Sequence, residues 1–257
     1  MKVDYQTCLT ELVEPGGSAL KHILSEWETR PGYEAVRSFA KNFVHEKLFE
    51  LTGASVIDAI NRGEHALGAV KKEEQLPDVE DFTCPFSWSD SFHAFIEERG
   101  RPPSFNEFRT WLTKERPEFV WNALKKTFPV REVQYQRAIR WRIGKAYYSL
   151  MRELYILTML RTDFGITLNY HVIADVRLRV DFWKGTNLFV LYFPNKKYRD
   201  DSEGRKMNPV KLFPAAKFTV TKVEVERGGF GKAWLLETEK IRAMATTVRT
   251  AMQKAKG

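Results

Sequence analysis

A chain of 257 residues, 43% of them apolar, is long enough for one large domain or two smaller ones and can bury a substantial core. It has no run of about 18 apolar residues, and its N-terminus lacks the apolar segment of a secretion signal, so we expect a cytoplasmic protein without a membrane span. The only cysteines, Cys8 and Cys84, are too far apart to suggest a disulfide scaffold or a cysteine-ligated zinc site.

The formal charge of +8 is unevenly distributed along the chain. Residues 1–130 contain 16 Lys and Arg against 21 Asp and Glu, whereas residues 131–257 contain 25 against 12, a net charge of +13. A half with this charge attracts polyanions, so it is the predicted nucleic-acid surface. The acidic N-terminal half is predicted to contact a protein partner or to regulate the other half. Charge asymmetry also occurs in proteins that bind no nucleic acid.

Residues 1–130 are predicted to be helical. Apolar side chains recur about every 3.6 residues, with Pro31 and Gly32 between the first two helices. The acidic segment 71–85 shows no periodicity and is predicted to be an exposed loop. The first three helices are predicted over 18–29, 33–51 and 56–62, with Ser55 as the N-cap of the third.

Three shorter helices are predicted next, over 89–98, 105–115 and 117–128. Ser104 precedes the second of them, and Glu107 follows three residues later, which is the pattern of a capping box. A pair of short helices is compatible with a helix-turn-helix, although plain helical packing is the commoner explanation.

A long helix is predicted over 132–161, with an apolar side. Arg140 and Lys145 stand largely outside that side and alternate with aromatic residues such as Tyr135 and Trp141, which suits contact with a phosphate backbone. The alternative is a solvated face with the aromatic rings in the core.

The segment that follows the long helix is predicted to form strands. Residues 175–183 alternate strictly, with Arg177 and Arg179 on the polar face, and Gly185 lies in a turn before a buried strand. Residues 195–214 form a basic loop. The strands are predicted over 166–174, 175–183, 188–193, 218–225 and 233–236, and a closing helix over 237–254.

The histidines do not suggest a metal site, because no two of them are four residues apart on a predicted helix. His171 lies within a predicted strand. A single histidine there is expected to be a hydrogen-bonded core or edge residue rather than a general base.

Glu153 on the long helix, Asp181 at the end of a strand and lysines after the next strand form an order that resembles the PD-(D/E)XK nuclease superfamily, over about residues 145–240. The resemblance implies that Glu153 and Asp181 bind Mg²⁺ and that Lys197 assists the attacking water, since carboxylates are the ligands of hard cations. The family's acid two residues before the lysine is not matched. Asn195 and Lys197 would be a degenerate version of that pair.

The resemblance implies an α+β protein in which a helical region, residues 1–130, precedes a restriction-endonuclease-like mixed sheet flanked by helices in residues 131–257. We expect a Mg²⁺-dependent DNA endonuclease from a bacterial defence or mobile-element (transposon) system. The alternative is a catalytically inactive nucleic-acid-binding module of a multiprotein complex, with Glu153 and Asp181 in ordinary surface ion pairs. DNA is expected rather than RNA, at Arg177, Arg179, Lys196, Arg199, Arg205, Lys206, Arg140 and Lys145.

Overall fold

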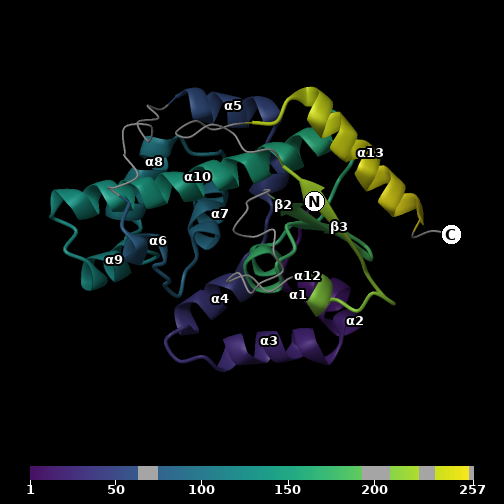
Figure 1. Ribbon diagram of the computed structural model, residues 1–257, viewed down its shortest axis with the longest axis horizontal. Coiled ribbons are helices and arrows are strands. Elements are labelled where there is room, and N and C mark those ends of the chain that lie inside the picture. Colours follow the sequence, from purple (N-terminus) through teal and green to yellow (C-terminus); the bar gives the residue numbers. More distant parts are fainter. Residues whose placement is uncertain (63–74, 193–208, 226–234, 255–257) are drawn as a thin grey trace. The chain divides into compact units, whose positions relative to one another are not determined.

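The computed structural model describes residues 1–62, 75–192, 209–225 and 235–254 (Figure 1). Contacts within the chain divide it into two compact units. The first unit comprises residues 1–49, 156–227 and 236–257, and the second comprises residues 50–155 and 228–235. Helices and a small three-stranded mixed sheet confirm the predicted α+β class. No helix in the described ranges is both long and apolar enough to span a bilayer.

The N-terminal part of the first unit is helical, as predicted. Helix α3 has the bounds expected from the sequence, and its apolar stripe buries Leu20, Leu24 and Trp27. The elements are α1 (Tyr5–Cys8), the π-helical turn η1 (Leu9–Val13), α2 (Glu14–Gly16), α3 (Ser18–Thr29), α4 (Glu34–Asn42) and the 3₁₀ turn η2 (Lys47–Glu50), which ends at the junction of the units.

The single helix predicted over 33–51 is wrong. Helix α4 ends at Asn42, because the backbone of Phe43 is extended. The chain then turns so that the His45 amide donates to the Val3 carbonyl at 3.1 Å. A long-range hydrogen bond therefore interrupts an apolar pattern that would have suited one continuous helix.

The sheet lies in the first unit and has the strand order β1-β2-β3. Strands β1 and β2 are antiparallel and form a hairpin with Gly185 in the left-handed region at φ +55°. Strands β2 and β3 are parallel, so a crossover connects them. The elements are β1 (Phe182–Lys184), β2 (Asn187–Tyr192), α12 (Pro209–Leu212), β3 (Thr219–Glu224) and α13 (Thr238–Lys254).

The structure confirms the predicted strands over 188–193 and 218–225 and the closing helix, each to within one residue among the described positions. The strand predicted over 233–236 falls partly outside the described residues, and Leu235 and Leu236 belong to no strand.

Of the two strands predicted over 166–183, only the last two residues, Phe182 and Trp183, lie in a strand, β1, and the rest of the prediction is wrong. Residues 172–178 are helical and end in the π-helical turn η6 (Ala174–Leu178), and before β1 only Asn169 forms a bridge, to Trp183. Ala174 and Leu178, four positions apart, are the fully buried members of this turn, which is a helical spacing. The strict alternation of apolar and polar residues therefore does not determine the backbone here.

Two buried histidines support the beginning of this helical turn. The ring of His171 accepts from the Ile173 amide at Nδ1 (3.1 Å) and donates from Nε2 to the Phe43 carbonyl (3.2 Å). The ring of His45 accepts from the Val172 amide at 3.0 Å. These contacts satisfy amides that the first turn of a helix leaves without partners. His171 is thus a hydrogen-bonded core residue, as predicted, and its burial lowers its pKa to about 4.

A carboxylate connects the N-terminal helices to the hairpin. Glu11, on η1, accepts hydrogen bonds from Asn169 Nδ2 (2.8 Å) and from Trp183 Nε1 (2.6 Å). Asn169 and Trp183 also exchange two backbone hydrogen bonds, at 2.7 and 3.0 Å. One side chain of η1 therefore binds both residues of the bridge, which lie far from it in the sequence.

The described part of the second unit is helical and is organised by aromatic packing. Tyr147 of α10 lies against Phe105 and Phe108 of α8, with ring centroids 5.7 and 6.3 Å apart, and its hydroxyl donates to the Pro103 carbonyl at 3.0 Å. The helices are α5 (Gly53–Asn61), α6 (Pro77–Glu80), α7 (Trp88–Arg99), α8 (Phe105–Thr110), the π-helical turn η5 (Trp111–Glu115), α9 (Trp121–Thr127) and α10 (Val133–Thr162), whose last turns belong to the first unit.

The capping pattern of the second unit is predicted well, with one error. Ser104 and Glu107 form the expected capping box. Helix α5, however, is capped by Thr52, and Ser55 is the reciprocal partner inside the helix rather than the N-cap. The short helix α6 lies within the segment that was predicted to be an exposed loop.

We expect His171 to make the protein acid-sensitive. Its folded pKa of about 4 lies below the ordinary value of 6.5, so the unfolded chain takes up the proton first as the pH falls. The contribution of His171 to stability is complete above pH 6.5 and is lost between pH 6.5 and 4, on the order of 3 kcal/mol. Urea unfolding at pH 7.5, 6, 5 and 4 measures it.

The matched control is His22→Gln, because His22 is an exposed histidine of the same unit. His22→Gln should keep the acid sensitivity, whereas His171→Gln should be less stable at pH 7.5 and lose less stability between pH 6.5 and 4. Equal pH profiles for the two variants would contradict the assignment.

Candidate nucleic-acid interface

Asp181, the predicted strand acid, lies directly before β1 and not at the end of a strand. Its Oδ2 atom accepts a hydrogen bond from the Leu191 amide at 2.7 Å. The hairpin ladder pairs Phe182 with Phe189 and stops there, while Val180 donates its amide to Ala174 instead. The carboxylate of Asp181 therefore continues the pairing of β2 where the backbone of β1 has turned away.

Glu153, the predicted helix acid, lies on α10 within the second unit, whereas Asp181 belongs to the first. Glu153 Oε1 accepts from the Ser149 hydroxyl one turn earlier, at 3.4 Å. Its neighbour Arg152 is largely buried, and this burial lowers the pKa of Arg152, an effect that the Glu153 carboxylate opposes. In the part of the chain that the structure describes, no three His, Cys, Asp or Glu side chains form a group that could hold a metal ion.

The predicted lysine and most of the predicted basic loop cannot be placed. They fall in the range 193–208, outside the described residues: Lys196, Lys197, Arg199, Arg205 and Lys206. Their roles stay predictions.

Arg177 and Arg179 do not share a strand face, which corrects the prediction for these residues. Arg177 is in η6, and its guanidinium lies over the rings of Trp27 (5.3 Å) and Tyr33 (5.9 Å). Arg179 ends that turn in the left-handed region at φ +63°. The helical backbone thus separates the two side chains that alternation would have aligned, and Arg177 is engaged in packing within its own unit.

Lys145 and its neighbour Arg142 are engaged by Glu80 of α6. Lys145 Nζ lies 3.3 Å from Glu80 Oε1, which also accepts from Trp141 Nε1 at 3.2 Å. The Arg142 guanidinium donates to the Glu80 backbone carbonyl at 3.1 Å. Lys145 is therefore a weaker candidate for phosphate contact than the sequence indicates, although more than half of its side chain is exposed.

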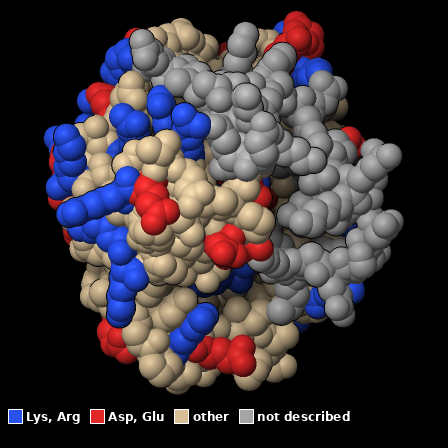
Figure 2. Space-filling model, turned by 60° about the vertical axis from the view of Figure 1, so that its left-hand side comes forward, with Lys and Arg blue, Asp and Glu red and all other residues tan. Residues whose placement is uncertain are grey.

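A strongly basic segment runs from residue 119 to residue 147 of the second unit, with seven Lys and Arg and one acid, Glu132. Lys125, Lys126 and Arg131 are exposed, and none of them forms an ion pair with a carboxylate in the described ranges. Figure 2 brings forward the side on which Figure 1 shows α8, α9 and the beginning of α10, and basic side chains gather there, with several acidic side chains between and beside them. We call residues 119–147 the basic segment.

Arg140, a predicted contact residue, lies within the basic segment. Sequence reasoning does not associate it with Arg109 of α8. Both side chains are half-buried, and the charge of Arg140 acts on Arg109. Arg140 Nε is buried without a hydrogen-bond partner among the described atoms. Only the contact between α8 and α10 brings the two together. The seven-residue spacing of Arg140 and Tyr147 is the sequence signal that would have placed them on one face of the helix.

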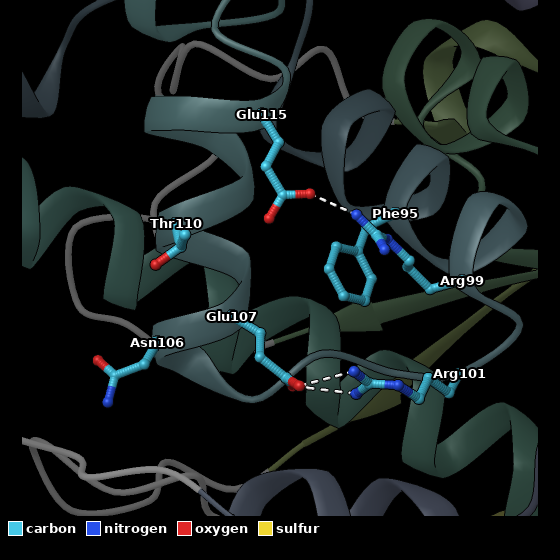
Figure 3. Close-up of a pocket in the computed structure, with 7 residues that line it drawn as sticks. All are labelled: Phe95, Arg99, Arg101, Asn106, Glu107, Thr110 and Glu115. Atoms are coloured by element: carbon cyan, nitrogen blue, oxygen red, sulfur yellow. Dashed lines mark hydrogen bonds and ion pairs between the residues drawn. The ribbon is translucent and has the colours of Figure 1, made fainter.

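A pocket in the second unit is lined by two arginines that both have carboxylate partners. Arg101 forms a two-pronged pair with Glu107, with N–O distances of 2.6 and 3.0 Å, and Arg99 pairs with Glu115 (Figure 3). The guanidinium of Arg101 lowers the pKa of Glu107 to about 2. The charges of this pocket balance, so it does not attract an anion. Its lining residues are Phe95, Arg99, Arg101, Asn106, Glu107, Thr110 and Glu115.

Comparison of the chain with protein-family models, with curated proteins and with solved structures found no match. The function is therefore inferred from the geometry and the charge of this chain.

We expect Asp181 to stabilise the hairpin. Asp181→Ala leaves the Leu191 amide without its acceptor and should lower the free energy of unfolding by about 1–3 kcal/mol, measured in urea. Asp181→Asn keeps an acceptor oxygen and should lose less than half of that amount. Equal stabilities of Asp181→Ala and the wild type would contradict the structural role.

Proposed function

We propose that this protein is a nucleic-acid-binding module that holds the phosphate backbone, DNA more readily than RNA, without reading the base sequence. The observation that carries the proposal is the basic segment, where seven Lys and Arg accompany one acid and three exposed cations have no carboxylate partner in the described ranges. Cations in such an array displace the counterions that condense on a nucleic acid, which makes binding favourable and dependent on salt.

Aromatic side chains in the same segment support the proposal. Phe128 and Tyr135 are half-exposed and stack on one another, with centroids 5.8 Å apart and ring planes 29° apart. Aromatic faces beside cations are the usual composition of surfaces that bind nucleic acid without sequence preference.

The proposed core is restriction-endonuclease-like. The last turns of α10, the antiparallel hairpin β1-β2 and the parallel strand β3 follow one another in the first unit, in the order helix, strand, strand, crossover, strand. This order supports the resemblance to the nuclease superfamily, whereas the bond from Leu191 to Asp181 favours a structural role for that acid. We therefore infer a non-catalytic module of a larger complex, with the acidic half of the chain available to a protein partner.

Mg²⁺-dependent DNA cleavage in a bacterial defence or mobile-element system is the second candidate. The observation in its favour is that Glu153 on the long helix α10 is followed along the chain by an acid beside the hairpin, Asp181, although this acid precedes β1 instead of ending a strand. Glu153 and Asp181 would hold the metal, which would activate a water, and Lys197 would assist.

Binding of a fluorescent 20-base-pair duplex, followed by anisotropy, tests the first candidate. With about four phosphates contacted, the Kd should rise roughly 100-fold between 50 and 200 mM salt, and binding should persist in chelator and should not be strengthened by Mg²⁺, which competes for the phosphates. A single-stranded RNA of equal length should bind more weakly. Absence of binding at 50 mM salt, or an affinity that does not depend on salt, would contradict the proposal.

The same preparation, incubated with supercoiled plasmid and Mg²⁺ or Mn²⁺, separates the two candidates. The module should bind the plasmid without nicking it, and Asp181→Asn should bind equally well. Metal-dependent nicking that is lost in Asp181→Asn would overturn the non-catalytic assignment, because this substitution keeps the acceptor oxygen of the hairpin.

A further inference from the structure

Arg109 and Arg140 lie on two helices of the second unit that are packed together. Tyr147 of α10 contacts Phe105 and Phe108 of α8. Arg140 lies seven residues before Tyr147, which places it on the same face of α10, and Arg109 directly follows Phe108. The aromatic contacts therefore pack together the two helices that carry these arginines, and the charge of Arg140 acts on Arg109.

The two arginines have no carboxylate partner in the described part of the chain. The other arginines of α7, η5 and the connecting loop differ in this respect, since Arg99, Arg101 and Arg116 all pair with glutamates. Two like charges without a carboxylate partner lower the stability of a fold, and a bound anion would compensate for this loss.

Two further facts point to an anion between these side chains. Arg140 Nε is buried without a hydrogen-bond partner, a situation that buried donors rarely show and that lowers stability. Burial, and then the neighbouring charge of Arg140, lower the pKa of Arg109. A phosphate oxygen would accept from the buried Nε and would relieve the repulsion at the same time, because guanidinium groups bind phosphate through paired hydrogen bonds.

We propose that Arg109 and Arg140 form a phosphate-binding pair that contacts the backbone of the nucleic acid beside the basic segment. This inference rests on the proposed function and names one contact within it. Exposed Lys125 and Lys126 supply long-range attraction, and the half-buried pair fixes the position of one phosphate.

The variants Arg109→Gln and Arg140→Gln test the pair, with Arg116→Gln as the control. Arg116 is also an arginine of the second unit, but it is paired with Glu98 and Glu118. In the duplex-binding assay, each test variant should raise the Kd at least fivefold and reduce the slope of log Kd against log salt by about 0.9. Arg116→Gln should change the Kd less than twofold. The test variants should melt at least as high as the wild type, because a repulsive pair is removed.

A second measurement uses pyrophosphate alone, at constant ionic strength, in a thermal shift assay. Pyrophosphate should raise the Tm of the wild type and of Arg116→Gln but not that of Arg109→Gln or Arg140→Gln. If Arg109→Gln and Arg140→Gln bind the duplex as tightly as the wild type and Arg116→Gln do, the phosphate pair is overturned and the proposed function stands. If pyrophosphate distinguishes the variants while no duplex binds, the pair binds a free phosphate compound, and both the backbone contact and the proposed function are overturned.

Discussion

The Glu11 carboxylate is the contact on which the arrangement of the first unit depends. It accepts from Asn169 and Trp183, and these two residues pair with one another through their backbones. The π-helical turn Leu9–Val13 presents Glu11, and β1 begins at the residue before Trp183. The position of the hairpin, and with it that of Asp181, therefore follows from a side chain that lies more than 150 residues earlier in the sequence. Removing such an acceptor leaves two largely buried donors unsatisfied.

In the second unit, apolar packing holds two like charges near one another. Its aromatic side chains hold α8 against α10, and the same contact holds Arg109 near Arg140, which repel one another. Apolar packing thus supports an electrostatic arrangement that is unfavourable in the free protein. Proteins commonly accept such a local loss of stability where a ligand restores it.

The sequence predicts those elements whose signals are local. Helix α10, helix α3, the capping box at Ser104 and the turn at Gly185 follow from periodicity, capping residues and turn chemistry within a few positions. Alternation is also a local signal and predicts a strand from residue 175, yet hydrogen bonds to two histidine rings and burial four residues apart favour a helix over residues 172–178. Glu11 and Arg109 gave no local signal at all. Their roles depend on contacts between segments that only the fold brings together.

Charge provides the link from fold to function. Of the contacts expected in the basic half, Arg177 packs on two aromatic rings, and those in the range 196–206 lie outside the described residues. The proposal rests on the basic segment, which contains the expected contacts Arg140 and Lys145, and on the pair at Arg109 and Arg140. Hydrogen–deuterium exchange with and without a 20-base-pair duplex tests this account most directly. If the basic segment and the arginine pair contact the duplex, exchange should be slower in peptides that cover residues 105–115 and 119–147. Unchanged exchange there, with protection confined to other parts of the chain or absent, would contradict it.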